Sequence, residues 1–328
     1  MFRRGAPDNQ KISQTYVQTG NRKIQAKGSR FVHKRGRRSL YHSLEDIAKV
    51  CSEQQIPFWK AVILDDCREE GISEEESMSK MEEIYTAMRD SDINYDPDLY
   101  SASGLVGTDA QKLRRYHEGG KGIVGDFCGK VMERALRVAE SNACMKRIVA
   151  APTAGSCGVV PAVLISMQEK YRFPDRKMAE SLYVASGIGG VIALRACLAG
   201  AEGGCQAEIG SASAMASGAA VYLLEGSSEA IIHGSAIALS SLLGLVCDPV
   251  AGLVEVPCVK RNVIGALNAV SSAELAMAGI RSRIPPDEVI DAMKSIGRSL
   301  PSELKETGRG GLAATPEGQK IRERLHGI

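Results

Sequence analysis

The sequence predicts an all-α fold in which a single large helical domain follows a short basic arm. From Gly122 onward, long and weakly charged segments are rich in Ala, Gly and Ser. Apolar residues occupy most of their helical faces, which is typical of helices buried on all sides. Few segments show the alternating β-branched pattern of strands. The length of 328 residues is sufficient for a substantial core.

Residues 1–39 form the predicted arm. They contain eleven Lys or Arg and one Asp, a net charge of +10 in a chain whose total is +2, so residues 40–328 carry −8. The arm lacks helical or strand periodicity, and we interpret it as a disordered extension that does not contribute to activity. A nucleic-acid tail, a membrane-surface tail and a targeting peptide are the alternatives, although no RNA-binding fold accompanies the arm.

Helical elements are expected from Ser43 onward, in residues 40–328. Ser43–Asp46 has the pattern of a helix N-cap, and Pro57 suits the first turn of a second helix. A row of methionines between residues 78 and 88 is interpreted as core filling on a third helix. Further helices are expected at residues 159–171, 181–201, 211–224, 230–247 and 263–280, and a last amphipathic helix begins at residues 285–287.

Cysteine usage and hydropathy predict a cytoplasmic protein. The nine cysteines show no compact disulfide framework, and the chain does not start with a secretory signal. Reduced thiols are typical of the cytoplasm. The uncharged stretch 230–247 contains a histidine and several serines, which favours a buried core helix over a membrane span.

A glycine-rich loop ahead of an apolar helix is the first candidate binding site. Residues 151–161 combine glycines with two hydroxyl side chains, and their backbone amides suit an anion such as a carboxylate. An ordinary loop at a helix start fits the same pattern. The candidate substrate-binding residues here are Thr153, Gly155, Ser156 and Gly158.

A second small-residue loop at residues 103–112 adds Ser103 as a substrate-binding candidate and Asp109 as a catalytic one. Capping of the next helix by Thr108 or Asp109 is the structural alternative. His117, one of only five histidines, is a candidate for acid–base chemistry, although a lone histidine is usually structural.

Three cysteines in the second half of the chain are candidate metal ligands. Two glycines precede Cys205, and Pro249 and Pro257 stiffen the loop that separates Cys247 from Cys258. Three thiolate ligands on an iron-sulfur cluster leave one iron free to act as a Lewis acid. Zinc is less favoured because no Cys-x-x-Cys pair is present. Simple burial of free cysteines is the alternative.

These motifs occur together in the order found in one known family. From about Leu40 to about Lys320, the chain resembles the alpha subunit of the iron-sulfur-dependent L-serine dehydratases. No single motif is specific to this family, but the occurrence of several long motifs in the same order is specific to it. The segments that carry the resemblance are residues 151–161, 201–214, 247–262 and 310–316.

The resemblance implies an all-helical catalytic domain that converts L-serine to pyruvate and ammonia. It implies a [4Fe-4S] cluster on Cys205, Cys247 and Cys258, whose open iron acts on the substrate hydroxyl. In the family a beta subunit or beta domain with a Ser-Ser-His-Thr motif completes the enzyme. That motif is absent from this chain, so a separate beta subunit is the expected partner, and either His117 or a histidine of the partner is the expected base.

Two other functions fit parts of the sequence. A pyridoxal-phosphate dehydratase performs the same net chemistry, but it needs a Schiff-base lysine and a phosphate-binding loop on an α/β scaffold. A non-enzymatic metal-binding protein with a basic arm is the second alternative.

Overall fold

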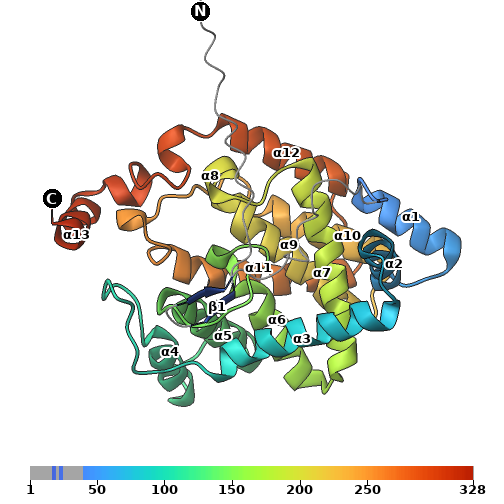
Figure 1. Ribbon diagram of the computed structural model, residues 1–328, viewed down its shortest axis with the longest axis horizontal. Helices are drawn as coiled ribbons and strands as arrows, with labels where there is room; N and C mark the ends of the chain where they lie inside the picture. The colour runs from blue at the N-terminus through green and yellow to red at the C-terminus, as the bar shows by residue number, and fades with distance from the viewer. Residues whose placement is uncertain (1–16, 20–21, 25–39, 328) are drawn as a thin grey trace, which may run out of the picture.

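The computed structural model describes residues 17–19, 22–24 and 40–327, and within them helices dominate (Figure 1). The α-helices are α1 Leu44–Gln54, α2 Phe58–Glu70, α3 Glu74–Ile93, α4 Asp109–Glu118, α5 Gly125–Ala143, α6 Val159–Tyr171, α7 Asp175–Arg195, α8 Gly200–Gly203, α9 Ser211–Leu223, α10 Ser228–Ser240, α11 Cys258–Met277, α12 Pro286–Ser299 and α13 Pro316–His326. Shorter 3-10 turns are η1 Ala154–Ser156, η3 Val250–Gly252, η4 Ser302–Leu304 and η5 Gly311–Ala314, and η2 Gln206–Gly210 is a π-helix. The all-α prediction is confirmed for the body of the chain.

Helix α9 is the centre of the fold, and all its residues are buried. It packs against α6, α7, α10 and α11, which surround it in Figure 1. Its small residues allow this close approach. A Cβ at Gly218 would lie 2.3 Å from Ile188 Cδ1 of α7 and 2.7 Å from Ser235 Oγ of α10. The sequence rich in Ala, Gly and Ser therefore makes α9 a helix that neighbours can contact on every side.

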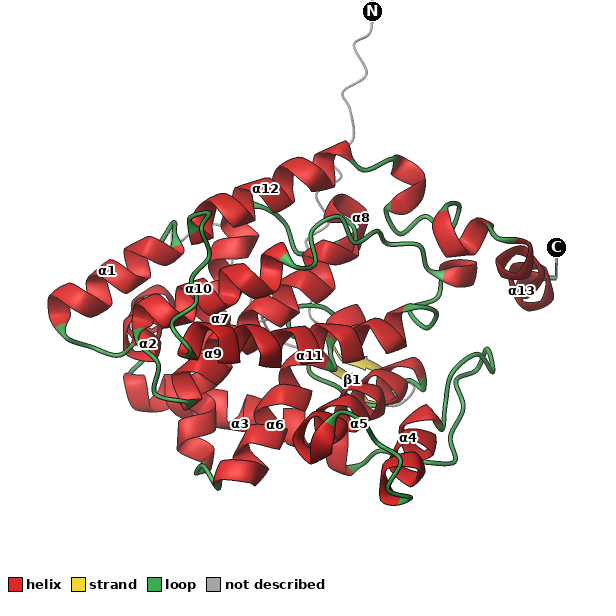
Figure 2. Cartoon of the chain, turned by 180° about the vertical axis from the view of Figure 1, so that it is seen from behind, coloured by secondary structure: helices red, strands yellow, loops and turns green. Residues whose placement is uncertain are grey.

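The amino-terminal helices α1–α3 cover one side of this core, where α2 and α3 pack against α7. The methionine row of α3 is buried, as predicted, with Met78, Met81 and Met88 each at most 1% exposed. Ser43 caps α1 by accepting a hydrogen bond from the Asp46 amide at 2.9 Å. Helix α12 packs against α1 and α10 along the edge of the molecule, and α13 lies at its periphery (Figure 2).

Several features differ from the sequence prediction. A short antiparallel hairpin, β1 Val17–Thr19 and β2 Arg22–Ile24, lies inside the segment predicted to be an arm without structure. The other residues of that arm lie outside the described part of the chain. Helix α10 ends at Ser240 rather than near residue 247, and α13 follows the helix predicted to be the last.

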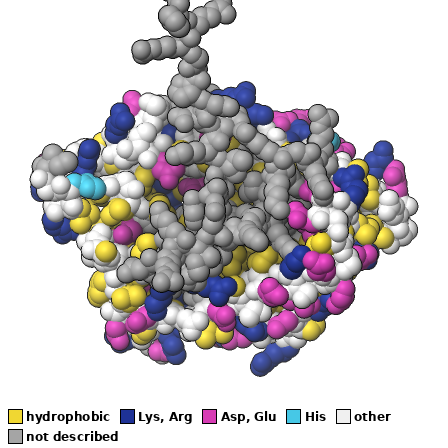
Figure 3. Space-filling view, viewed as in Figure 1, with side chains coloured by type: hydrophobic (Ala, Val, Ile, Leu, Met, Phe, Trp, Pro, Cys, Tyr) yellow, Lys and Arg dark blue, Asp and Glu magenta, His cyan; other side chains and the backbone are white. Residues whose placement is uncertain are grey.

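The described residues also bear on two alternatives. An α/β scaffold of the kind required by the pyridoxal-phosphate alternative does not occur in residues 40–327, which form helices and turns. None of the helices in the described residues is both long and apolar enough to cross a bilayer. On the face in Figure 3, side chains of both charge signs are interspersed around the visible rim.

Candidate active site

Three cysteines lie where the π-helix, the loop after α10 and the start of α11 come together. Cys205 directly precedes the π-helix η2, Cys247 lies in the loop, and Cys258 is the first residue of α11. All three are free and at most 6% exposed. We call these three side chains the thiol site.

Backbone and amide hydrogen bonds hold these segments together. The Gln206 amide donates to Leu245 O at 2.9 Å, and the Gln206 side chain accepts from the Gly244 amide at 2.9 Å. These bonds join the start of η2 to the chain just before Cys247. The Cys247 amide in turn donates to Leu304 O at 2.8 Å, which brings the carboxyl-terminal region to the same site.

The three thiols are near enough to influence one another electrostatically. Burial raises the pKa of Cys205 to about 12, and it raises the pKa of Cys247 and Cys258 as well. The Cys247 pKa is raised further by Glu208 and by the other two cysteines, and the Cys258 pKa by Cys205 and Glu208. Because such effects require proximity, the fold brings the three predicted ligands to one place.

The donor set of the thiol site suits a soft metal. Thiolates favour iron-sulfur clusters, zinc and Cu(I) over hard cations. In the described residues, no three His, Cys, Asp or Glu side chains are placed to hold a single metal ion. Thiols with raised pKa values are protonated at neutral pH, so a metal that binds them displaces those protons. The residues fit a group with several metal atoms, in which each thiol binds a different one.

The Thr153 loop contacts the π-helix that follows Cys205. The Thr153 Oγ1 donates a hydrogen bond to Glu208 Oε1 at 2.7 Å, and the Ser156 hydroxyl lies 3.1 Å from Thr153 Oγ1. A Cβ at Gly155 would approach the Glu208 carboxylate to 3.1 Å, so glycine leaves that oxygen accessible. The predicted substrate loop and the predicted metal ligands are therefore neighbours, joined by Glu208.

Asn262 ties the same loop to α11, one turn after Cys258. Its side-chain amide donates to Gly155 O and to Cys258 O, both at 2.9 Å, and its Oδ1 accepts from the Gly158 amide at 2.8 Å. The Gly158 amide is thus already engaged by the protein. Of the four residues predicted to bind substrate here, Thr153, Gly155 and Ser156 are the ones that face Glu208 or its hydrogen-bond network.

Glu208 is a site residue that the sequence analysis did not select. Burial raises its pKa to about 7, against the lowering effect of the Thr153 hydrogen bond. One signal was available in the sequence, because Glu208 is the only charged residue between positions 203 and 224. A lone acid in a segment of small apolar residues is costly to bury, which favours a specific role.

Ser103 lies against the loop that connects two of the cysteines. The hydroxyls of Ser101 and Ser103 both donate to Glu255 Oε2, the first at 2.8 Å. Glu255 is buried and precedes Cys258 by three residues. The structure therefore gives Ser103 a contact that orders the loop between Cys247 and Cys258.

Asp109 is held in ion pairs at the start of α4. Its carboxylate lies 2.8 Å from Lys112 Nζ and 3.2 Å from Lys260 Nζ. Burial alone raises the pKa of Asp109, but the hydrogen bonds from the two lysines outweigh burial and lower it. Neither Thr108 nor Asp109 caps α4 with its side chain. The Glu140 carboxylate instead accepts a hydrogen bond from the Asp109 amide at 2.8 Å. A carboxylate stabilised in this way is a weak base.

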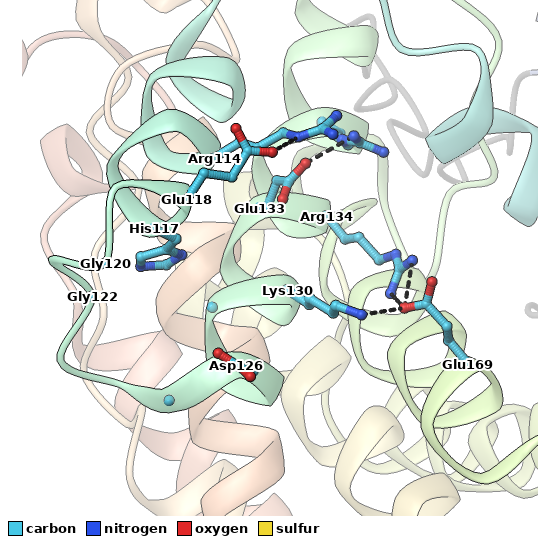
Figure 4. A pocket seen from close by; sticks show the side chains of 13 residues that line it. Arg114, His117, Glu118, Gly120, Gly122, Asp126, Lys130, Glu133, Arg134 and Glu169 are labelled. Atoms are coloured by element: carbon cyan, nitrogen blue, oxygen red, sulfur yellow. Dashed lines mark hydrogen bonds and ion pairs between the residues drawn. The ribbon is translucent and has the colours of Figure 1, made fainter.

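His117 lines a separate cavity of about 700 Å³, mainly between α4 and α5. Figure 4 shows its ring beside the glycine-rich turn, and the ring fills the space where a Cβ on Gly122 or Gly129 would lie. No member of the thiol site or the Thr153 loop is among the described residues that line this cavity. The structure does not bring His117 to the thiol site.

Comparison with known proteins identifies the family. The profile of the family described as "Serine dehydratase alpha chain" matches residues 40–313. The chain belongs to this family. The match begins where the described body of the chain begins, and it contains all three cysteines of the thiol site and the Thr153 loop. The resemblance inferred from the motifs is confirmed.

The relatives of this chain include proteins of similar length and longer proteins. The probable L-serine dehydratase alpha chain of Bacillus subtilis is 42% identical, over 88% of this chain and 96% of its own length. The L-serine dehydratase alpha chain of Peptoniphilus asaccharolyticus is 43% identical, over 86% of this chain and 97% of its own. The L-serine dehydratase of Helicobacter pylori strain J99 is 34% identical, and the match covers only 62% of that longer protein.

Proposed function

We propose that this chain is the alpha subunit of an L-serine dehydratase, a lyase that converts L-serine to pyruvate and ammonia. The names of the alpha-chain relatives support this activity. The observation that carries the proposal is the contact of the Thr153 loop with Glu208, which puts polar groups suited to a small zwitterion next to three buried thiols.

We further propose that Cys205, Cys247 and Cys258 hold a [4Fe-4S] cluster. Three free and buried thiols, whose raised pKa values reflect one another's presence, support a metal group that favours thiolate ligands. Such a cluster supplies a Lewis acid at the iron without a protein ligand. Reduced thiols of this kind agree with a cytoplasmic location, which we also propose.

The residues of the chain have distinct roles in this proposal. The hydroxyls of Thr153 and Ser156 and the backbone at Gly155 bind the substrate carboxylate. Ser103 orders the loop between two ligands through Glu255. Asp109 anchors α4 to Lys260 on α11, in the first turn after Cys258, rather than moving a proton.

A separate beta subunit is the proposed partner. The term alpha chain in the names of the relatives supports it, and the longer Helicobacter relative contains sequence beyond the part that this chain matches. Because His117 lines another cavity, we assign the base that removes the α-proton to the partner.

Anaerobic pyruvate formation from L-serine tests the function, measured with and without a coexpressed beta subunit and together with iron and sulfide content. We expect pyruvate only from the pair of subunits, and visible absorbance that bleaches in air. Pyruvate formation by an iron-free preparation that depends on added pyridoxal phosphate would contradict the proposal.

A further inference from the structure

Arg261 contacts the segments of all three cysteines. It lies on α11, three residues after Cys258, and its side chain is 15% exposed. Its Nη1 donates to Val246 O at 2.8 Å and its Nη2 to Asp248 Oδ1 at 2.8 Å, so the guanidinium bonds the residues on both sides of Cys247. The charge of the guanidinium partly offsets the raised pKa of the Cys205 thiol, and the Gln206 amide, next to Cys205, donates to Leu245 O beside Val246 at 2.9 Å.

Asp248 extends this network to the carboxyl-terminal region. Its second oxygen, Oδ2, accepts a hydrogen bond from the Leu312 amide at 2.8 Å. Gly311 has a φ of +56°, and a Cβ there would lie 2.4 Å from Asp248 Oδ2. Both the backbone conformation and the close approach therefore require glycine at this position.

Backbone hydrogen bonds secure the same region from the other side of Cys247. The Cys247 amide donates to Leu304 O, and Cys247 O accepts from the Glu306 amide, both at 2.8 Å. Residues 302–316, which we call the C-terminal segment, thus contact Cys247 through its own backbone and through Asp248. They form part of the wall around the thiol site.

The chemistry of arginine explains why this residue suits the position. A guanidinium is planar and offers five donors in a fixed arrangement, whereas a lysine ammonium is a compact charge on a flexible stem. The acceptors here are the Val246 carbonyl and the Asp248 carboxylate, one on each side of Cys247. A lysine side chain cannot reproduce this set of bonds.

We propose that Arg261, with Asp248, is a positioning residue that holds the three cysteine segments and the C-terminal segment together as one preformed cradle. The identity of the bound group as an iron-sulfur cluster rests on the proposed function. The cradle itself rests on the hydrogen bonds of the described residues and exists before the group binds.

The test compares Arg261→Gln and Arg261→Lys with Arg134→Gln. Arg134 is a matched control because it pairs with Asp92 on α3 at nearly the same burial, with side-chain exposures of 14% and 4% against 15% and 5% for Arg261 and Asp248. Each anaerobically reconstituted protein is mixed with an iron chelator, and the rate of iron loss is followed. Circular dichroism and denaturant midpoints confirm that each variant is folded.

We expect both Arg261 variants to lose iron about 10-fold faster than the wild type, the lower end of what loss of an outer-shell partner costs a metal site. Arg134→Gln should stay within about 2-fold. Equal rates in the wild type and in folded Arg261→Gln overturn the inference, and so does a wild-type rate in Arg261→Lys.

Limited proteolysis of the metal-free proteins tests the cradle without iron. Arg261→Gln and Asp248→Asn should be cleaved within residues 302–316 several-fold faster than the wild type and Arg134→Gln, because the contacts of the C-terminal segment are weakened. If the wild type takes up no iron, the proposed cluster fails, and the cleavage rates still decide whether the cradle exists. Unchanged cleavage overturns the inference.

Discussion

The thiol site and the His117 cavity differ in how their charges are balanced. In the cavity, each of the four lining cations has an acidic partner, and Figure 4 shows Glu169 bonded to both Lys130 and Arg134. The other two pairs are Arg114 with Glu118 and Arg137 with Glu133. The thiol site instead buries three thiols, with the partly buried Glu208 beside them.

This difference shows why the His117 cavity is a weaker functional candidate than the thiol site. Paired charges at an open surface are satisfied without a ligand and contribute little. Acidic groups gathered in a buried site repel one another when they ionise, so they favour a bound cation. The three thiols, whose pKa values are raised by Glu208 and by neighbouring thiols, therefore make the thiol site the place where a bound cation is favoured.

The largest expected effect comes from removing one thiol. Cys247→Ser should abolish iron binding and reduce pyruvate formation by more than about 100-fold, beyond the usual cost of losing an outer partner of a metal site. Iron analysis and the anaerobic serine assay measure both. Cys51→Ser, at an equally buried cysteine of α1, is the matched control. Full iron content in folded Cys247→Ser would contradict the assignment of the metal to the thiol site.

Glu208 should make the stability of the metal-free chain depend on pH. Its pKa of about 7 in the folded protein lies above the usual glutamate value of 4.5, so the folded state binds more protons than the unfolded state between these pH values. The free energy of unfolding therefore falls as the pH rises from 4.5 to 7, by at most about 3 kcal/mol. The stabilising contribution of Glu208 is fully present below pH 4.5 and is lost above pH 7.

Glu208→Gln should remove this dependence, because the amide oxygen still accepts the Thr153 hydrogen bond and carries no charge. Urea unfolding of the metal-free wild type and variant at several pH values measures the effect. A wild-type free energy that is flat or rises with pH across this window would show that Glu208 is not buried as an acid.

Asn262→Ala should separate the Thr153 loop from α11. The substitution leaves the buried Gly158 amide without its acceptor, which costs about 1–3 kcal/mol of unfolding free energy. Asn262→Asp keeps that acceptor but sets a buried carboxylate oxygen against the carbonyl oxygens of Gly155 and Cys258, so it should cost at least as much. Denaturant unfolding compares the wild type with the two variants. Equal stability of all three would show that Asn262 does not hold the Thr153 loop to α11.

The smallest effect is expected at His117. With the base on the partner, His117→Asn should lower the rate of dehydration by less than about 10-fold, whereas loss of a general base costs about 10²–10⁴-fold. Steady-state kinetics of the two-subunit enzyme measure this. A drop of 100-fold or more with iron content unchanged would return the catalytic role to His117 and the cavity.

Much of the fold follows from local pattern. The segment expected at residues 159–171 is helix α6 with the same bounds, and the proline before Phe58 starts α2 as expected. The end of α10 was not predictable in the same way, because residues 241–247 are as apolar as the helix before them. There the chain leaves the helix to pair with the start of η2 and with Leu304, and such pairing partners are far away in sequence.

The sequence by itself determined the all-α class, the family and the three cysteines, because helical periodicity and motif order are local properties of the chain. Only the tertiary structure decided which polar groups share a site. It joined Glu208 to Thr153, used Arg261 to hold the cysteine segments, and left His117 in a cavity of its own. These relations depend on contacts between residues 13 to 55 positions apart, for which a linear pattern carries no distance.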